Sequence, residues 1–514
     1  MHTLKHAPIG LMSTPAVSCV IREREGGVAS GGFILTASHN PGGLEEDFGI
    51  KYNCENGGPA PEGLTDAIFS RTKSLTRILW CPSLPDIDLD KLGVTALPGG
   101  FSVEVVDPVA DYAAALQRIF DFDALRALVA RPDFSMAYDG MCGVAGPYGR
   151  GILGDLLGVP AHCLHNCDPL PDFGGHHPDP NLTYAEELVA LCGLTRTGER
   201  SSSSGSGGGS GKPLPVLGAA QDGDADRNMI LGSGFFVTPS DSVALIAAHA
   251  SAIPFFVRAG GLKGVARSMP TSCALDRVAA AAGIPLFEVP TGWKFFGNLM
   301  DSGERGGRDY TPFLCGEESF GTGSNHVREK DGLWAVLAWM SLLAAANAGT
   351  PVGGLVGVEA LVRAHWARFG RNYYCRYDYE GLETARADAV FARLRARVAA
   401  GPGALGVVGG GGGGEGQYTL ATCDEFSYTD PVDGSVSAAQ GLRFGMQDGS
   451  RVVYRLSGTG SVGATLRVYI EKFESDPKLH DQPTAVALKG LVDVALALAD
   501  IENLTGRKEP TVIT

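Results

Sequence analysis

The sequence predicts an α/β protein of several domains, and three observations support this fold class. With 514 residues, the chain is long enough for more than one hydrophobic core. Strand-like and helix-like segments alternate between residues 109 and 363, which is typical of α/β units. From about residue 364 the pattern changes to several strands and one long helix, so we expect an α+β domain at the C-terminal end.

Breaks in this pattern divide the sequence into four parts, which we expect to fold as four domains. The expected boundaries are 1–108, 109–237, 238–363 and 364–514. Two tracts rich in glycine, at 201–211 and 409–414, interrupt the second and fourth parts. Such tracts cannot pack a hydrophobic core, so we interpret them as loops.

Within these parts, the period of the apolar residues predicts the main elements. Strands are expected at 33–35, 134–138, 216–220, 373–379, 451–456 and 464–469, and a short apolar segment lies at 286–289. Helices are expected at 17–22, 111–128, 151–157, 240–252, 333–346 and 382–399. The candidate buried stripe of the helix at 111–128 comprises Tyr112, Leu116, Ile119 and Phe120. Ser240 or Asp241 is the expected cap of the helix at 240–252.

Composition argues against several classes of protein. The formal net charge of −15 disfavours binding to nucleic acid and to anionic membranes. The eleven cysteines have no repeated spacing, which favours a reducing compartment. No secretory signal opens the chain, and the apolar run at 333–346 is too short to span a bilayer. We therefore expect a soluble cytoplasmic protein, with a plastid as the open alternative.

A serine follows the first expected strand. The strand at 33–35 leads into Thr36-Ala37-Ser38-His39-Asn40 and then into the breaker Pro41-Gly42-Gly43. Ligands of α/β sheets bind at the carboxyl ends of strands, and a hydroxyl displayed there can act as a nucleophile or carry a phosphoryl group. A serine in an ordinary polar turn is the alternative.

Three aspartates alternate in a second turn. Asp222, Asp224 and Asp226 follow the strand at 216–220, so their carboxylates project to one side and repel one another. Hard oxygen ligands of this kind suit Mg²⁺ or Ca²⁺. An EF-hand loop is excluded because its sixth position would be Arg227 and its twelfth Ser233. A solvated acidic turn stays as the alternative.

Two arginines flank a loop of glycine, serine and threonine near the C-terminal end. Arg455 and Ser457 precede the loop, Thr459 lies in it and Arg467 follows it. Backbone N–H groups, hydroxyls and guanidinium groups together suit a phosphate. A plain glycine turn between strands is the alternative.

A fourth stretch combines acceptors with a lysine. Glu317 and Ser319 could bind sugar hydroxyls, and Lys330 could hold a phosphate or move a proton. A charged solvated loop is the alternative. A zinc site at His162, Cys163, His165 and Cys167 is disfavoured, because the thiols lack the usual spacing and no second thiol pair follows.

Together these stretches resemble the α-D-phosphohexomutase family, and specifically its eukaryotic-type phosphoglucomutase branch. The similar motifs lie in one order over nearly the whole chain, at 36–43, 222–227, 315–323 and 455–467. Further similar stretches lie at 174–182, 290–297 and 430–435. The resemblance implies three related α/β domains, the first of them incomplete, and a C-terminal α+β lid domain around a central cleft.

The resemblance also implies a reaction. Glucose 1-phosphate and glucose 6-phosphate would be interconverted through glucose 1,6-bisphosphate and a phosphorylated Ser38, with another hexose phosphate as the alternative substrate. Mg²⁺ would be bound by Ser38, Asp222, Asp224 and Asp226. Groups near the transferring phosphoryl group would be His39, Lys51 and Lys330, and either lysine could move a proton. The substrate would be held by Arg227, Thr291, Gly292, Glu317, Ser319, Arg455, Ser457, Thr459 and Arg467. Small hexose phosphates are the only expected partners, and the expected state is a monomer.

Two departures from the family pattern matter. The family has a segment before the position of Ser13 that includes a Thr-Ser-Gly-Leu-Arg loop, and this sequence has no counterpart. An incomplete sequence is one explanation. A catalytically impaired phosphosugar-binding or scaffolding relative is the other, and it is the alternative function. The second departure is Ala225, where the family usually has glycine. If that position needs a positive φ, alanine destabilises the turn by about 1 kcal/mol.

Overall fold

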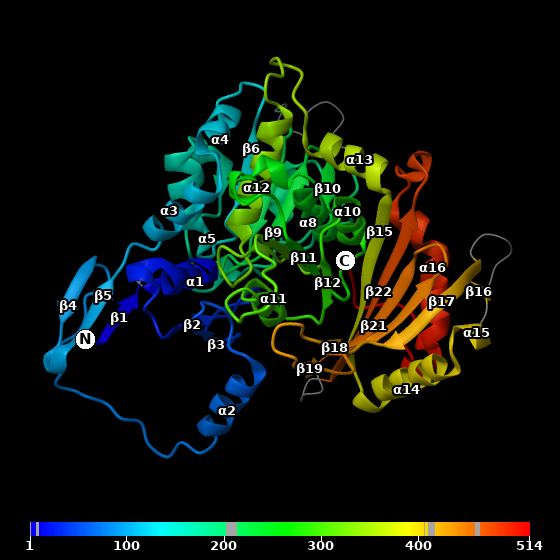
Figure 1. Cartoon of the computed structure of the whole chain (residues 1–514), viewed down its shortest axis with the longest axis horizontal. Coiled ribbons are helices and arrows are strands. Elements are labelled where there is room, and N and C mark those ends of the chain that lie inside the picture. The colour runs from blue at the N-terminus through cyan, green and yellow to red at the C-terminus, as the bar shows by residue number, and fades with distance from the viewer. Residues whose placement is uncertain (1, 7–9, 202–212, 406, 410–416, 458–462) are drawn as a thin grey trace. The chain divides into compact units, whose positions relative to one another are not determined.

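The computed structural model describes residues 2–6, 10–201, 213–405, 407–409, 417–457 and 463–514 (Figure 1). The chain divides into two compact units. The first unit comprises Met1–Arg267, Ala282–Phe287 and Gly292–Val362, and the second comprises Ser268–Ala281, Glu288–Thr291 and Arg363–Thr514. Each helix in the described part is too short or too polar to cross a membrane.

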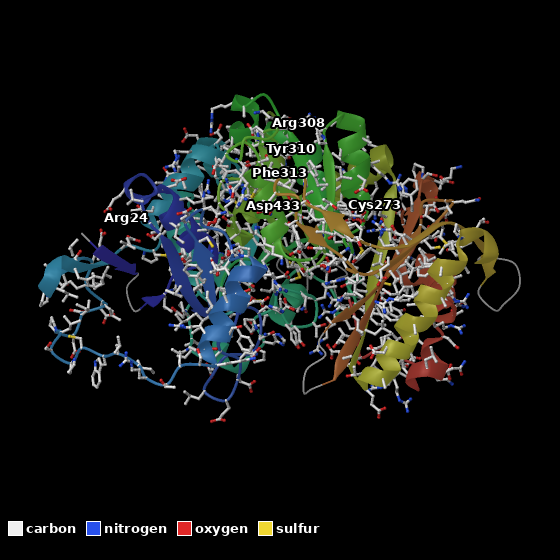
Figure 2. All side chains as sticks on the ribbon, turned by 60° about the horizontal axis from the view of Figure 1, so that its bottom comes forward. Arg24, Cys273, Arg308, Tyr310, Phe313 and Asp433 are labelled. Carbon is white, nitrogen blue, oxygen red and sulfur yellow. The ribbon has the colours of Figure 1, made fainter. Side chains whose placement is uncertain are left out.

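The N-terminal part of the first unit contains two small sheets and two helices. One sheet has the order β1-β5-β4, and β2 and β3 form an antiparallel hairpin. The bounds are β1 (His2–His6), β2 (Gly31–Thr36), β3 (Gly49–Cys54), β4 (Gly93–Ala96), β5 (Phe101–Val105), α1 (Thr14–Glu23) and α2 (Glu62–Thr72). Arg24, labelled in Figure 2, forms ion pairs with Glu104 of β5 and with Asp111. These ion pairs join the end of α1 to the neighbouring sheet.

A five-stranded sheet with the order β10-β9-β8-β6-β7 follows. Its strands are β6 (Met136–Asp139), β7 (Leu164–His165), β8 (Leu217–Gln221), β9 (Asn228–Gly232) and β10 (Phe235–Val237). The accompanying helices are α3 (Ala110–Ile119), α4 (Phe122–Val129), α5 (Ala145–Tyr148), the π-helical segment Gly149–Leu156 and α6 (Glu186–Leu191). β8 runs parallel to β6 and is buried along its whole length, as expected for a central strand in an α/β sheet.

A third sheet has the order β12-β11-β13-β14. Its strands are β11 (Gly264–Ser268), β12 (Leu286–Val289), β13 (Phe313–Gly316) and β14 (Thr322–Ser324). Its helices are α8 (Pro239–Ala248), α9 (Pro254–Arg258), α10 (Ala274–Ala282), α11 (Trp293–Met300), α12 (Gly332–Ala346) and α13 (Val358–Phe369). Tyr310 and Phe313, labelled in Figure 2, lie with their ring centroids 4.7 and 6.4 Å from that of Phe287. α12 is apolar on all sides and almost wholly buried, as such a sequence predicts.

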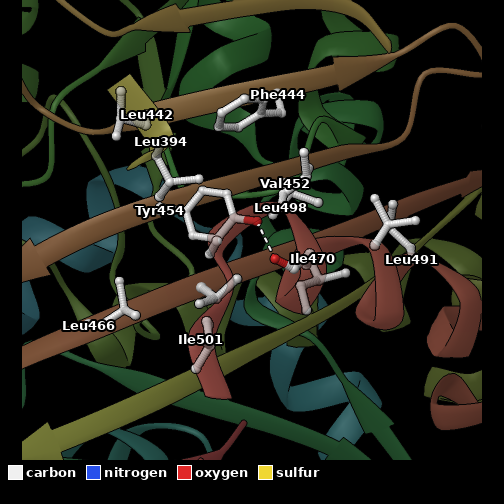
Figure 3. Packing of buried hydrophobic residues seen from close by; sticks show 14 of the residues in the cluster. Leu394, Leu442, Phe444, Val452, Tyr454, Leu466, Ile470, Leu491, Leu498 and Ile501 are labelled. Carbon is white, nitrogen blue, oxygen red and sulfur yellow. Dashed lines mark hydrogen bonds between the residues drawn. The ribbon is translucent and has the colours of Figure 1, made fainter. Parts of the chain in front are cut away.

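The C-terminal domain is built on a seven-stranded sheet with the order β16-β17-β20-β21-β22-β15-β23. The strands are β15 (Arg371–Leu382), β16 (Val407–Gly409), β17 (Gln417–Glu425), β20 (Leu442–Met446), β21 (Arg451–Ser457), β22 (Ala464–Glu474) and β23 (Val512–Ile513), with β18 (Tyr428–Thr429) and β19 (Val436–Ser437) as a separate pair. The helices are α14 (Thr384–Ala400), α15 (Pro402–Leu405), α16 (Thr484–Ala499) and α17 (Ile501–Thr505). Figure 3 shows the core that α14 and α16 form with this sheet, including Leu394, Tyr454 and Leu491.

Two local predictions were wrong, and side-chain caps explain both. The helix predicted at 111–128 is broken into α3 and α4, because the carboxylate of Asp121 accepts from the backbone N–H groups of Asp123 and Ala124 and starts a new helix. The helix predicted to be capped at Ser240 or Asp241 is capped by Thr238, with Pro239 in its first turn. The expected buried stripe of Tyr112, Leu116, Ile119 and Phe120 is confirmed.

Two buried tyrosines of the C-terminal sheet offer a test of this core. The hydroxyl of Tyr454 donates to the carbonyl oxygen of Ala495 in α16 at 2.6 Å (Figure 3), whereas the buried hydroxyl of Tyr379 has no hydrogen-bond partner among the residues that the structure describes. We expect Tyr454→Phe to lower the free energy of unfolding by about 1 kcal/mol. Tyr379→Phe should leave it unchanged or raise it, because only an unpaired hydroxyl is lost.

Urea unfolding followed by circular dichroism measures both effects on the same transition. Tyr379→Phe is the matched control, because it removes the same atom from another buried position in the same sheet. Equal destabilisation by the two substitutions would contradict the assignment.

Candidate active site

Ser38 lies in the turn that joins β2 to β3. β2 ends at Thr36, whose Oγ1 accepts a hydrogen bond from the backbone N–H of Ser38 at 2.8 Å. The φ of Ser38 is 58°, a left-handed conformation that residues other than glycine rarely adopt. Backbone strain of this kind is concentrated at functional sites, and it supports the serine as a functional residue.

The three predicted aspartates form the metal-loop cluster, which follows β8. Asp222, Asp224 and Asp226 are all buried, and their potential ligand atoms lie within 4.8 Å of one another. Four of their six carboxylate oxygens are buried and accept no hydrogen bond from the described residues, namely Oδ2 of Asp222, Oδ1 of Asp224 and both oxygens of Asp226, although two lysine ammonium groups form ion pairs with Asp226. Buried carboxylate oxygens are the ligands that a hard divalent cation prefers, so this cluster could hold such a cation.

Ala225 occupies the strained position of the metal loop. Its φ is 64°, so this position does require the left-handed conformation. Hydrogen bonds hold the turn, since the carbonyl oxygen of Ala225 accepts from Nε2 of Gln221 at 3.1 Å and from the N–H of Gly332 at 3.3 Å. The strain that alanine introduces, about 1 kcal/mol, is small enough for these contacts to offset.

Gly223 brings the serine turn and the metal loop together. A Cβ atom on Gly223 would lie 2.5 Å from the carbonyl oxygen of Ser38 and 2.8 Å from Cζ of Phe173. The backbone of Gly223 is fixed from both sides, donating to Pro178 O at 3.2 Å and accepting from the N–H of Val144 at 3.0 Å. Only glycine allows the two loops to approach this closely.

Two lysines neutralise part of the charge of the metal-loop cluster. Nζ of Lys51, from β3, lies 2.6 Å from Asp224 Oδ2 and 3.5 Å from Asp226 Oδ2, and Nζ of Lys330 lies 3.2 Å from Asp226 Oδ1. Burial opposes the charge of Lys51, but the attraction of Asp224 and Asp226 outweighs it and raises the pKa of Lys51. The structure therefore brings Lys51, Lys330 and the three aspartates together.

The pKa values of two aspartates shift in opposite directions. Burial and the charges of Asp226 and Asp224 raise the pKa of Asp222 well above its usual range. Burial acts on Asp224 as well, but the ammonium group of Lys51 outweighs it and lowers the pKa of Asp224 to about 2. The difference follows from position, because Lys51 contacts Asp224 directly.

Thr14 is a member of the site that the sequence analysis missed. It is completely buried, its Oγ1 donates to Asp224 Oδ2 at 2.7 Å, and its N–H donates to the carbonyl oxygen of Asp224 at 3.0 Å. The local signal at 13–15 is a helix start, with Ser13 as the cap of α1. Such a signal indicates where a helix begins but cannot show that the next residue contacts an aspartate 210 positions later.

His39 and Arg227 also lie beside the cluster. Burial, together with the positive charges of Arg227 and Lys330, lowers the pKa of His39 to about 3, so its imidazole is neutral at pH 7. Nδ1 of His39 lies 3.4 Å from Ser38 Oγ. The backbone N–H of Arg227 donates to Asp222 Oδ1 at 2.9 Å, and its guanidinium group lies 3.8 Å from Asp179.

The predicted sugar loop lies between β13 and β14. Glu317 is buried, its N–H donates to the carbonyl oxygen of Gly321 at 2.8 Å, and its Oε1 accepts from the N–H of Gly292 at 3.3 Å. Burial raises the pKa of Glu317. Ser319 is half-buried, and Phe320 has a φ of 68°. A strand pairing between Arg227 and Gly321 joins this loop to the metal loop.

In the second unit, Arg455 of β21 and Arg467 of β22 are direct cross-strand neighbours. Like charges in this position destabilise a sheet unless a counter-charge joins them. Asp378 of β15 supplies one, since its Oδ2 lies 3.7 Å from Nε of Arg467, but it is shared with Arg376 at 2.9 Å. Nη1 of Arg455 donates to the hydroxyl of Tyr469 at 3.3 Å. This concentration of guanidinium groups suits an anion such as phosphate.

The remaining predicted residues have different outcomes. Ser457 ends β21 beside the two arginines, and Thr459 lies outside the described residues. Thr291 belongs to the second unit, and its buried hydroxyl accepts or donates no hydrogen bond within the described ranges of the chain. Among the described residues, only the three aspartates group as potential metal ligands, and Cys167 instead donates to the carbonyl oxygen of His165.

Models of four protein domains match nearly the whole chain. They are the phosphoglucomutase/phosphomannomutase α/β/α domain I at 3–78, domain II at 110–233, domain III at 239–364, and the phosphoglucomutase-1 C-terminal domain at 371–511. The expected fold class of three α/β domains and a C-terminal domain is thereby confirmed.

Several known proteins are similar over almost the full chain. A probable cytoplasmic phosphoglucomutase 1 of Arabidopsis thaliana is 54% identical over 513 residues, which cover 98% of this chain and 84% of that protein. A chloroplastic phosphoglucomutase 1 of Marchantia polymorpha is 52% identical over 506 residues, 98% of this chain and 72% of that protein. The open form of the exocytosis-sensitive phosphoprotein pp63/parafusin, a phosphoglucomutase from Paramecium, has a TM-score of 0.86 at 49% identity and covers 100% of this chain and 85% of that one.

The close approach at Gly223 leads to a prediction about the metal loop. We expect Gly223→Ala to weaken Mg²⁺ binding about tenfold or more, because the added Cβ must displace the serine turn or the metal loop. Isothermal titration calorimetry with Mg²⁺ measures the affinity, and thermal unfolding checks that the variant is folded.

Gly297→Ala is the control for this substitution. Gly297 lies within α11, and no atom outside its own helix lies within 4 Å of an added Cβ. This variant should bind Mg²⁺ normally and should be equally or more stable, because alanine favours helices. An unchanged Mg²⁺ affinity in Gly223→Ala would show that the two loops do not depend on each other.

Proposed function

The chain belongs to the phosphoglucomutase/phosphomannomutase family, and from this premise we propose that it interconverts glucose 1-phosphate and glucose 6-phosphate. The proposal depends on one observation above all. A strained serine turn lies against a loop of three buried aspartates, and two lysines contact the same loop. Phosphoryl transfer needs mainly positioning and charge stabilisation, which this arrangement can supply.

The proposed reaction begins with a phosphoryl group on Ser38. The 6-hydroxyl of glucose 1-phosphate attacks the phosphorus, so a bond from O6 to phosphorus forms while the bond from Ser38 Oγ to phosphorus breaks. The product of this half-reaction is glucose 1,6-bisphosphate, which turns over and returns its 1-phosphoryl group to Ser38. Glucose 6-phosphate is then released, and the phosphorylated serine is restored.

Mg²⁺ is the proposed metal, bound by Asp222, Asp224, Asp226 and an oxygen of the phosphorylated Ser38. A cation there would offset the negative charge of the carboxylates and make the phosphorus a better electrophile. Its fit is supported by the four buried carboxylate oxygens that accept no hydrogen bond within the described part of the chain.

The charged side chains around the serine have separate proposed roles. The raised pKa of Lys51 favours a permanent ammonium group, which would neutralise the transferring phosphoryl group. Lys330 is therefore the better candidate for moving the proton of the sugar hydroxyl. His39, which is neutral at pH 7, would donate a hydrogen bond near Ser38 Oγ, and Arg227 would neutralise further charge.

The substrate has two further proposed contacts. Glu317, Ser319 and the backbone at Thr291 and Gly292 would bind the sugar hydroxyls in either orientation. Arg455, Ser457, Thr459 and Arg467 would bind the phosphate that does not react. The crowded positive charge of Arg455 and Arg467 supports this second contact.

A catalytically impaired binding protein is the alternative, and it is not favoured. Relatives that are 54% identical over 98% of the chain are named as phosphoglucomutases. Relatives named cytoplasmic and relatives named chloroplastic both match. We propose a cytoplasmic location, because the cytoplasmic relative is 54% identical and the chloroplastic one 52%. We also propose that the enzyme acts as a monomer.

Replacement of Ser38 tests the function directly. Ser38→Ala should lower kcat by about a thousandfold or more, since it removes the hydroxyl that carries the phosphoryl group in the proposed reaction. A coupled assay that converts glucose 1-phosphate to glucose 6-phosphate measures the rate, and mass spectrometry locates the phosphoryl group. Ser74→Ala, at an exposed position of the same unit, is the control.

The outcomes separate the candidate functions. Turnover by the wild-type chain that disappears in Ser38→Ala supports the mutase, and the same assay with mannose 1-phosphate decides between the hexoses. A wild-type chain that binds glucose 1-phosphate without turnover, after its Ser38 has been phosphorylated, would favour the binding protein.

Replacement of Arg467 tests the second phosphate contact. Arg467→Lys keeps the charge but loses the two parallel N–H donors, so we expect KM for glucose 1-phosphate to rise about tenfold while kcat changes little. Arg386→Lys on the exposed face of α14 is the matched control. A fall in kcat at unchanged KM would place Arg467 at the reacting phosphate instead.

A further inference from the structure

One buried hydrogen bond joins the two segments that carry the active-site lysines. Nδ2 of Asn53 donates to Oε1 of Glu329 at 2.8 Å, and the side chains come from segments 276 residues apart. Asn53 is 0% exposed and Glu329 is 3% exposed. Glu329 directly precedes Lys330 in the fourth stretch of the sequence analysis, but neither residue was among the predicted site residues. The interaction is buried, so water does not compete with it.

The positions of the lysines follow from this hydrogen bond. Lys51 and Asn53 are two residues apart on β3, so their side chains project from the same face of the strand. Lys330 directly follows Glu329 in the chain. Nζ of Lys51 and Nζ of Lys330 both reach Asp226, at 3.5 Å and 3.2 Å on different carboxylate oxygens. The Asn53–Glu329 bond therefore joins the two segments whose lysines both form ion pairs with Asp226.

The groups around this bond restrict how it can rearrange. The second N–H of the Asn53 amide donates to the carbonyl oxygen of Gly57 at 3.0 Å, which fixes the amide plane. The backbone oxygen of Glu329 would lie 3.1 Å from a Cβ on Gly323, so the chain packs closely behind Glu329. Burial raises the pKa of Glu329 to about 7, while Lys51 and the Asn53 hydrogen bond favour its charged form.

We propose that Asn53 and Glu329 are positioning residues, whose hydrogen bond sets the spacing of Lys51 and Lys330 around Asp226 and thereby aligns both cations with the transferring phosphoryl group. This proposal rests on the proposed function of the site. It differs from a purely structural role, because loss of the bond should change the chemical step more than the stability of the fold.

A neighbouring pair provides a matched control. Asn56 lies three residues after Asn53, and its Nδ2 donates to Asp301 Oδ2 at 2.8 Å. Asp301 also pairs with Arg328 at 2.6 Å, immediately before Glu329. The Asn56–Asp301 bond thus joins the turn after β3 to the same part of the unit, with the same chemistry and length, but it does not adjoin a lysine of the site.

A double-mutant cycle on kcat tests the proposal. Asn53→Ala and Glu329→Ala should each lower kcat about 10- to 100-fold, with KM for glucose 1-phosphate changed less than threefold. Because both substitutions remove the same bond, kcat of the double variant should be no lower than that of the less active single variant. Glu329→Gln keeps an acceptor oxygen for Asn53, so it should retain kcat within about threefold. Asn56→Ala should retain kcat as well.

Lysine labelling provides a readout that does not depend on activity. The extent of acetylation of Lys51 and Lys330 by a limiting reagent is measured by mass spectrometry on folded wild-type, Asn53→Ala and Asn56→Ala proteins. Loss of the bond should raise the labelling of Lys51 or Lys330 several-fold in Asn53→Ala alone. This result would support the positioning role even if the wild-type chain had no mutase activity, in which case only the proposed function fails.

Two results would overturn the proposal. One is an Asn53→Ala variant that keeps kcat within twofold and labels like the wild type. The other is an Asn56→Ala variant that loses as much kcat as Asn53→Ala, because both bonds would then act only by holding the fold together.

Discussion

The burial of three carboxylates in one short loop is the constraint on which the first unit depends. Asp222, Asp224 and Asp226 cannot remain together away from water unless positive charge joins them. The structure meets this need with cations from separate segments, Lys51 on the β2–β3 hairpin and Lys330 beside α12. Charge compensation thus brings the β2–β3 hairpin and the segment before α12 to the metal loop. Because the serine turn belongs to this hairpin, it also lies against the metal loop.

The serine turn, the metal loop and the sugar loop each contain a residue with strained backbone dihedral angles. Ser38, Ala225 and Phe320 each adopt a left-handed backbone conformation without being glycine. Each lies in a different one of the three loops. The carbonyl oxygens of Ala225 and Phe320 accept hydrogen bonds from the N–H groups of Gly332 and Asn228, and the N–H of Ser38 donates to Thr36 at the end of β2. Strained loops persist only where the surrounding structure determines them, which is consistent with the proposed role of these loops in phosphoryl transfer.

In the second unit, like charges are also close together, but there they are the positive charges of two arginines. Arg455 and Arg467 face each other across two strands, and Asp378 provides only part of the compensation because it also contacts Arg376. A bound anion would stabilise this arrangement, because it would reduce the repulsion between the two guanidinium groups. In the proposed reaction, the phosphate of the substrate that does not react would supply that charge.

The sequence determined the elements and the chemistry that local patterns encode. The alternation of strands and helices, the buried stripe on α3 and the apolar α12 could all be predicted, because periodicity reports directly on burial. The types of side chain at 38, 222–226 and 455–467 indicated phosphate and a divalent cation. The destabilisation of the metal loop by Ala225 could also be predicted, on the condition that this residue has a positive φ.

Only the tertiary structure decided which of these groups meet. Nothing near Thr14 indicates that its hydroxyl reaches Asp224, and nothing near Asn53 indicates a bond to Glu329, because each pair is separated by more than 200 residues. The break between α3 and α4 depended on whether the side chain of Asp121 turned back to cap a helix. Local patterns set what a residue can do, whereas long-range packing sets its neighbours, and the chemistry of this site depends on those neighbours.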